Sequence, residues 1–533
     1  MRVLSYILPL ATMMLGGAAL ANWLWFSVPP REAMRLPVIE EPMVASSGPV
    51  VPERMAGVLT VGVGVPGRQG GSWPGFRGAE LDGISRDATP LARAWPAAGP
   101  ARLWGLELGL GYAGAAVHKG RVYVLDYIAP PDTPTPVAAP PRDAGVSPAL
   151  NVPSARTGGD ESTLPQDAGK PALHSLGEAG MPASREGETP SPREPAAPEF
   201  GDALRCLSLD DGREIWRYVY PVAVKVNHGQ SRTVPAVNDR YVVSLGPKCH
   251  VICLDAVTGQ LLWAKDLRDE FGTTEPQWYA GQCPIIDGDR VILAPAGPDV
   301  LMMAVDLATG RVLWKTPNPM KWRMTHVSIV PMEFAGRRMF VYCGSGGMAG
   351  VSSDEGRILW QTTEWKIAVA TVPTPVVLPE GRLLCTGDYK AGSAMFQLAE
   401  SGGKLTIRRL WRLPSEQFAS RQHTPVYYDG YLYAVRPDGL LTCLHPDGRV
   451  VWTSGSDTFG LGPLLISSQG LIYALDDDGL MVLAEATPQG YRPLARAKIL
   501  PGGECWAPLA LSDGLLIARD IRRMVCLDIR ANE

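Results

Sequence analysis

The chain has 533 residues, 46% of them hydrophobic, with a formal net charge of −4 at pH 7. This hydrophobic content is ample for a large core. The near-neutral charge, without a basic block, argues against a nucleic-acid-binding surface. Although a chain of this length could hold several domains, one array of repeats covers most of it. The chain has 15 tryptophans, and most of them lie in that array.

The first thirty residues are an export signal in either of two forms. Residues 3–30 contain no charged residue, and the small residues at 19–21 would serve as a signal-peptide cleavage site. Against cleavage, aromatic residues follow at 23–26, as they do at a membrane face, and the apolar run is long enough to span a bilayer. We predict a signal peptide or membrane anchor over 1–30, and we favour an inner-membrane anchor with the body in the periplasm.

Residues 31–72 are rich in Pro, Gly and Val and show little amphipathic periodicity, which predicts a flexible tether. The stretch Trp-Pro-Gly-Phe-Arg-Gly at 73–78 then opens the repeat region, which extends to residue 533.

A β-hairpin of one design recurs along this region. In the copy at 254–263, Gly259 supplies the positive φ of the turn, Asp255 can bond back to the turn backbone, and the second strand ends on Trp263. A unit that cannot bury its own apolar face must stack against copies of itself. The copies end on tryptophans that step by 47, 51, 46, 51 and 41 residues, close to the period of a four-stranded propeller blade. These residues are Trp216, Trp263, Trp314, Trp360, Trp411 and Trp452.

The spacing predicts eight blades in a closed ring. Inner strands are expected to start near residues 115, 234, 283, 326, 375, 425, 463 and 507. The last copy lacks its outer strand, and residues 102–108, which contain Trp104, supply one. Closure by this N-terminal strand would remove two open sheet edges. We therefore predict a monomeric, all-β, eight-bladed propeller of four-stranded antiparallel blades.

An insertion at 129–199 interrupts the first blade between its second and third strands. It contains 15 prolines and almost no aromatic residues, a composition that predicts disorder. The second-to-third-strand connection lies on the propeller face that also carries the loops joining successive blades. The insertion is therefore either a partner-binding arm above a binding face or a tolerated surface loop.

The 73–78 stretch, followed by Asp-Gly-x-x-Leu-x-Trp hairpins, resembles bacterial proteins with pyrroloquinoline-quinone (PQQ)-like propeller repeats. These include quinoprotein alcohol dehydrogenases and the BamB-type propellers of outer-membrane barrel assembly. The resemblance implies the fold over residues 73–533, whereas one fold hosts many functions. A dehydrogenase would hold PQQ above a Trp floor, with Ca²⁺ on acidic and amide oxygens and an Asp as base.

The central loops offer only Glu275, Glu416 and Glu504 as obvious carboxylates, whereas Ca²⁺ must be coordinated by several oxygens at once. We therefore expect no cofactor and no metal, with PQQ and Ca²⁺ as the alternative. No catalytic residue is assigned.

Loops that join one blade to the next converge on the central channel and mix aromatic residues with Arg, Gln and His. Such a set would suit a ligand or protein partner, or it could simply cap the channel. The candidates are Arg232, Trp278, Tyr279, Gln282, Trp322, Arg323, His326, Trp365, Arg421, Gln422, His423 and Trp506. Trp104 and the hairpin tryptophans, by contrast, are expected to pack between blades.

The nine cysteines are an odd number without a disulfide or zinc spacing, and we expect small buried residues in strands. The favoured function is a non-enzymatic binding or scaffolding module of the cell envelope, with envelope proteins as partners and no nucleic acid. A quinone-dependent or other small-molecule enzyme is the alternative, and a sensor ectodomain is a third possibility.

Overall fold

A computed structural model describes residues 51–129, 200–225, 231–367 and 369–531. The expected membrane segment at 1–30 and all but the first residue of the insertion at 129–199 lie outside these ranges. The described residues belong to one compact unit. Within the described ranges, no helix is long and apolar enough to cross a membrane.

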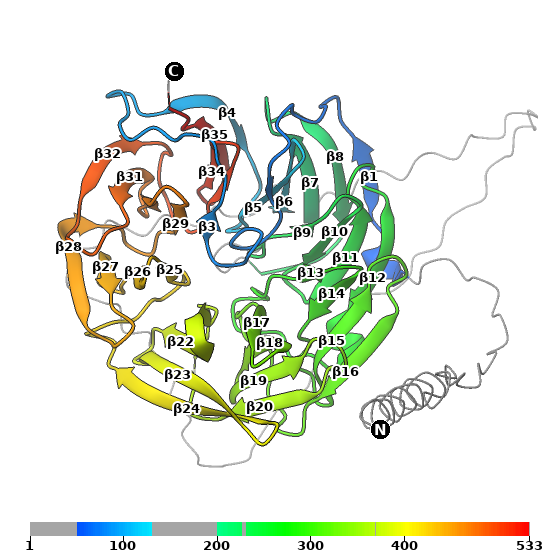
Figure 1. Ribbon diagram of the computed structural model, residues 1–533. Helices are drawn as coiled ribbons and strands as arrows, with labels where there is room; N and C mark the ends of the chain where they lie inside the picture. Colours follow the sequence, from blue (N-terminus) through cyan, green and yellow to red (C-terminus); the bar gives the residue numbers. More distant parts are fainter. Residues whose placement is uncertain (1–50, 130–199, 226–230, 368, 532–533) are drawn as a thin grey trace, which may run out of the picture. The chain divides into compact units, whose positions relative to one another are not determined.

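Eight antiparallel sheets form a ring of eight blades, which confirms the predicted propeller (Figure 1). Strands are given from the channel outwards, blade by blade. Blade 1 holds β5 (Ala115–His118), β6 (Arg121–Ile128), β7 (Gly201–Ser208) and β8 (Glu214–Tyr220). Blade 2 holds β9 (Ala236–Val237), β10 (Tyr241–Leu245), β11 (His250–Asp255) and β12 (Leu261–Asp266). Blade 3 holds β13 (Ile285–Asp287), β14 (Arg290–Leu293), β15 (Val300–Asp306) and β16 (Val312–Pro317).

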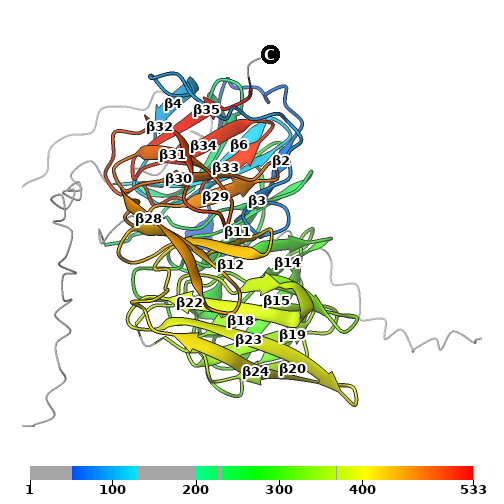
Figure 2. The ribbon, with the colours of Figure 1, turned by 60° about the vertical axis from the view of Figure 1, so that its left-hand side comes forward.

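The next three blades repeat this order. Blade 4 holds β17 (Val330–Phe334), β18 (Arg337–Gly344), β19 (Gly347–Ser352) and β20 (Ile358–Thr362). Blade 5 holds β21 (Val376–Leu378), β22 (Arg382–Gly387), β23 (Gly392–Ser401) and β24 (Lys404–Leu413). Blade 6 holds β25 (Val426–Tyr428), β26 (Tyr431–Val435), β27 (Leu440–Leu444) and β28 (Val450–Thr458). Figure 2 shows β20 and β24, the outer strands of neighbouring blades, side by side.

The last two blades complete the ring. Blade 7 holds β29 (Leu464–Ser467), β30 (Leu471–Leu475), β31 (Leu480–Glu485) and β32 (Pro493–Lys498). Blade 8 holds β33 (Ala510–Ser512), β34 (Leu515–Arg519) and β35 (Arg523–Asp528), and its outer strand is β4 (Ala101–Glu107). The pairing of β4 with β35 places Trp104 opposite Cys526. The predicted closure by an N-terminal strand is therefore confirmed. The helical segments in the described ranges are η1 (Glu53–Met55), α2 (Leu267–Phe271) and η2 (Pro379–Gly381).

Part of the expected tether is structured, which corrects the prediction for residues 51–72. β1 (Val58–Val61) adds a strand outside β8, and β2 (Ser72–Trp73) adds one inside β5. Both strands are short, and their hydrogen bonds are made with strands of blade 1 that lie far away in sequence. The local composition does not show these bonds, and for this reason it predicted a linker. β3 (Ile84–Ser85) likewise pairs with β29, in parallel.

Residues 73–85, from the end of β2 to the end of β3, occupy the centre of the ring, and we call them the central segment. Figure 1 shows this blue segment, beside β3, inside the ring of inner strands. It is bonded to blades 1, 2, 6, 7 and 8 and borders blades 3, 4 and 5. Trp73 pairs with Val117 of blade 1, and the Val237 N–H of blade 2 donates to the Pro74 carbonyl at 2.8 Å. Phe76 and Leu81 share a small cavity with the starts of the inner strands of blades 3, 4 and 5.

Arg77 ties the central segment to blade 6. Its guanidinium donates to the carbonyls of Thr424 at 2.7 Å and Pro425 at 2.9 Å. It also donates within the segment, to the carbonyls of Leu81 at 3.1 Å and Asp82 at 2.7 Å. Burial lowers the pKa of Arg77 to about 10, so it keeps its charge at neutral pH. One side chain thus satisfies four carbonyls inside the ring.

Tryptophans of the outer strands join neighbouring blades. The Trp263 indole N–H donates to the Leu307 carbonyl in the turn of the next blade at 2.8 Å. Trp104, Trp216, Trp411 and Trp452 make the corresponding bonds to Leu209, Ala256, Pro446 and Thr487. A Cβ on Gly259, which has a φ of 76°, would come within 2.6 Å of the Trp216 ring. The turn therefore needs glycine both for its backbone and for this contact.

Two tryptophans depart from this arrangement. Trp360 donates instead to the Met339 sulfur of its own blade at 3.1 Å, because the following blade has a long β23–β24 hairpin in place of the Asp-Gly turn. Trp314 packs against Gly356 of the next blade, but its indole N–H finds no acceptor among the described residues.

The propeller has two faces. The blade-joining face carries the loops from each outer strand to the next inner strand and the hairpins between second and third strands. The hairpin face carries the other two hairpins of each blade. β6 and β7 stay paired up to Ile128 and Gly201, and the Tyr127 hydroxyl donates to the Val222 carbonyl in a blade-joining loop at 3.0 Å. The insertion therefore leaves from the blade-joining face, as predicted.

All nine cysteines are buried and unpaired, as expected for small apolar residues in strands. Burial raises the pKa of the Cys283 thiol to about 11 and that of the Cys206 thiol to about 12, so these two carry no thiolate at neutral pH.

Candidate functional site

Several of the predicted site residues are structural. Gln282 is fully buried and bonds both the N–H and the carbonyl of Ala294, at 2.9 and 3.3 Å. The Trp322 ring is buried against Gly344 to Gly347, and the backbone N–H of Trp322 donates to the Asn318 side-chain oxygen at 3.1 Å. Trp365 is 2% exposed, with the Arg412 guanidinium 5.8 Å from its ring centre. These side chains hold loops in place and present little surface to a ligand.

A second group gathers on the loops that lead into blades 8, 1 and 2. Tyr112 stacks on Trp506 with ring centres 5.1 Å apart, and its hydroxyl donates to Glu504. The Arg232 guanidinium lies 5.3 Å from the Tyr112 ring centre. Burial lowers the pKa of Arg232, and its Nε and Nη2 atoms find no hydrogen-bond partner among the described residues. Sequence reasoning missed Tyr112, although it lies directly before the first inner strand.

The loop from blade 2 to blade 3 is strained. Trp278 and Tyr279 have φ values of 65° and 74°, a left-handed conformation that bulky residues rarely adopt. The Tyr279 hydroxyl donates to the Lys225 carbonyl at 2.8 Å, and the Lys248 ammonium lies 4.9 Å from the Tyr279 ring centre. Trp278 itself is only half-buried. This loop is held in its conformation by neighbours on two other loops.

Both histidines of the candidate set are neutral at physiological pH. Desolvation lowers the pKa of His326 to about 4, helped by Arg232, and that of His423 to about 4, helped by Arg77. His326 Nδ1 and His423 Nε2 are buried without a partner in the described part of the chain. Arg421 forms an ion pair with Asp388, and Gln422 is half-buried on the same loop.

The loops of blades 2 to 5 enclose a cavity of about 250 Å³ on the blade-joining face. Of the twelve candidates, Arg323 and His326 line it. Arg323 is exposed, and its side chain has no hydrogen bond or ion pair among the described residues. Val369, 43% exposed, supplies an apolar wall next to the largely buried Met324 and Ile367. A free cation beside apolar side chains in a concave surface is the arrangement that this face offers a ligand.

The carboxylates in the central loops do not fit the quinone and Ca²⁺ pair. Glu275 is bonded by Lys248 at 3.0 Å and by Arg268 at 3.4 Å, Glu504 accepts from Tyr112, and Glu416 is exposed on a third loop. Nowhere in the described ranges do three His, Cys, Asp or Glu side chains gather in a metal-binding group. Ca²⁺ needs six to eight oxygens from converging ligands. We derive no redox step for this site, and the absence of a cofactor stays a prediction.

The comparisons with known proteins agree with the sequence resemblance. Residues 201–408 match the family model described as outer membrane protein assembly factor BamB. The outer membrane protein assembly factor BamB of Moranella endobia (strain PCIT) is 22% identical over 293 residues, which cover 51% of this chain and 69% of that protein. Residues 201–408 are thus similar to BamB, and the eight-bladed propeller is shown by the structure itself.

Three solved structures are partly similar to the chain. BamB from Moraxella catarrhalis is 16% identical with a TM-score of 0.43, covering 61% of this chain and 91% of that one. Quinohemoprotein alcohol dehydrogenase from Comamonas testosteroni is 10% identical with a TM-score of 0.41, covering 87% and 81%. A europium-containing methanol dehydrogenase is 10% identical with a TM-score of 0.42, covering 86% and 89%.

Proposed function

We propose that this propeller is a non-enzymatic binding module of the cell envelope that docks a protein partner on its blade-joining face. The cavity around Arg323 carries the proposal. It combines an unpaired guanidinium with the exposed Val369 side chain, and arginine beside apolar residues is typical of the anchors of protein interfaces. The similarity of residues 201–408 to an outer-membrane assembly factor supports an envelope location and a protein partner.

The domain organisation of the proposal follows the sequence. Residues 1–30 would direct export and could tether the protein to the inner membrane, with the propeller in the periplasm. The insertion at 129–199 leaves from the face that we assign to the partner, which supports a role for it as an accessory arm. The protein would act as a single propeller.

Copurification from detergent-extracted envelope, after mild crosslinking, tests the proposal with matched variants. Val369→Asp and Arg323→Ala should each abolish or strongly reduce recovery of the partner. Leu313→Asp is the control, because Leu313 is 42% exposed, close to Val369, but lies on the outer strand β16. Equal recovery with all three variants would contradict the assigned face.

The enzyme alternative is tested separately. Addition of PQQ and Ca²⁺ to the purified protein should produce neither a saturable binding isotherm nor dye-linked alcohol or sugar oxidation. A micromolar, Ca²⁺-dependent isotherm accompanied by oxidation would replace the binding-module proposal by a quinoprotein one.

A further inference from the structure

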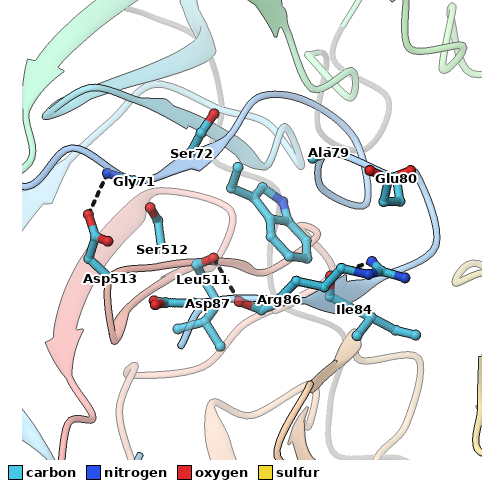
Figure 3. A pocket seen from close by; sticks show the side chains of 12 residues that line it. Gly71, Ser72, Ala79, Glu80, Ile84, Arg86, Asp87, Leu511, Ser512 and Asp513 are labelled. Carbon is cyan, nitrogen blue, oxygen red and sulfur yellow. Dashed lines mark hydrogen bonds between the residues drawn. The ribbon is translucent and has the colours of Figure 1, made fainter. Parts of the chain in front are cut away.

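A second cavity, of about 320 Å³, lies on the hairpin face, opposite the surface assigned to the partner. Its walls are the stretches of chain at the two ends of the central segment, residues 71–73 and 84–87, which we call the two arms. Its floor is the inner strand β33 with the following turn. Because β2 pairs with blade 1 and β3 pairs with blade 7, the arms flank the inner edge of blade 8 and leave a slot between them. Figure 3 shows this slot.

The charge of the cavity is negative. Glu80, Asp87 and Asp513 line it together with one base, Arg86. Arg86 forms an ion pair with Asp82, which balances its charge, and it is also attracted to Glu80. The nearby Arg530 is likewise paired, with Asp528. A cation is therefore the favoured occupant.

The acceptors that remain free lie at the two ends of the slot. Asp87 accepts backbone N–H groups with both oxygens, from Thr89 at 2.9 Å and Gly514 at 2.7 Å, and so contributes charge alone. Asp513 accepts the Gly71 N–H at 2.6 Å with Oδ2, while its Oδ1 has no hydrogen bond among the described residues. Glu80 is exposed and has no hydrogen-bond partner in the described part of the chain. In Figure 3, Glu80 lies on one side of the cavity and Asp513 on the other.

The hydroxyl of Ser512 is an independent indication that the cavity binds a ligand. The residue is 2% exposed, and its Oγ atom is buried without a hydrogen-bond partner among the described residues. Such a hydroxyl costs free energy unless something bonds it. Ser512 lines the cavity, and Figure 3 shows its hydroxyl on the side that faces Gly71 and Ser72, close to Asp513. Together, Ser512 Oγ and Asp513 Oδ1 offer an ammonium group two oxygens at this end.

Part of the lining is apolar. Trp73, Ile84 and Leu511 contribute to it, and in Figure 3 the side chain of Arg86 runs across the slot between its two ends. A methylene chain between two ammonium groups would bury its carbons there and place one charge at each end. We propose that this cavity binds an aliphatic diammonium compound, with Glu80 holding one ammonium group and Asp513 with Ser512 holding the other.

Isothermal titration of the purified full chain tests the proposal with cadaverine, with putrescine and hexamethylenediamine as length variants. Cadaverine should bind with a Kd of about 1 mM or tighter, and pentylamine, which has one charge, at least about tenfold more weakly. Pentanediol, which has no charge, should not bind. Raising the NaCl concentration should weaken the binding of the diamines, because the Glu80 end of the cavity is open to solvent and its charge is screened by salt.

Variants assign the two ends. Ser512→Ala removes a hydroxyl without a hydrogen-bond partner and Glu80→Gln changes an exposed side chain, so both variants should fold. Each substitution should lower the affinity for cadaverine at least about tenfold. Glu416→Gln, on the opposite face, should leave the affinity unchanged. Equal binding of pentanediol, unchanged affinity in Glu80→Gln or Ser512→Ala, or no heat with any of the three diamines would each overturn the proposal. None of these outcomes bears on the partner face.

Discussion

Replacement of Arg77 by methionine should destabilise the propeller far more than the loss of an ordinary surface charge. The guanidinium donates to four carbonyls, of Leu81, Asp82, Thr424 and Pro425, inside the ring. Methionine keeps the length and apolar stem of the side chain but leaves these acceptors unsatisfied. Hydrogen bonds to a charged donor contribute about 1.5–3 kcal/mol each, and part of this is offset by the cost of burying the charge, so we expect a net loss of about 3–5 kcal/mol.

Thermal unfolding measures this loss. With an unfolding entropy of about 2.1 cal/mol/K per residue, a unit of about 480 residues loses about 1 °C of Tm per kcal/mol, so Arg77→Met should lower Tm by about 3–5 °C. Arg86→Met is the control, because Arg86 is exposed and its ion pair with Asp82 is worth at most about 1 kcal/mol. Equal, small shifts for the two variants would refute the assignment of Arg77 as the link between the central segment and blade 6.

Three further predictions concern closure, pH and the insertion. Deletion of residues 101–107 removes β4 and exposes the edge of β35, so Tm should fall sharply in calorimetry, and an unchanged Tm would refute closure by this strand. Burial raises the pKa of Asp202 to about 7, so the stability that its protonated form contributes should be lost as the pH rises from about 4 to 7. Asp202→Asn should flatten this part of the curve of Tm against pH. Parallel curves for the two proteins would contradict the assignment. Replacement of residues 130–199 by a short Gly/Ser linker should leave Tm nearly unchanged, because closure entropy depends only logarithmically on loop length, and a large fall in Tm would show that the insertion supports the fold.

The repeat fold could be predicted from the sequence because its signals are local. The turn around Gly259 and the tryptophan that ends each hairpin recur at one period, and that period fixes the number of blades. Closure by β4 followed from the missing strand of the last copy. β1, β2 and β3 escaped prediction because they are two to four residues long and owe their hydrogen bonds to strands far away in sequence.

The candidate site was predictable only as a region. The twelve candidates lie on the loops that join one blade to the next, but residue type could not tell which of their side chains are buried. Gln282 and Trp322 are buried and hydrogen-bonded within the protein, whereas Arg323 lines the cavity and can contact a ligand. The hydrogen bonds of Arg77 to blade 6 cross 347 and 348 positions of sequence, and no local pattern indicates them.

Site-specific photocrosslinking in the intact envelope tests the central claim most directly. A photoreactive residue at Val369 should crosslink to one discrete protein partner, and the same residue at Leu313, equally exposed on β16, should not. Crosslinking to the same partner from both positions, or no crosslink from Val369, would contradict the proposal that the blade-joining face is the binding surface.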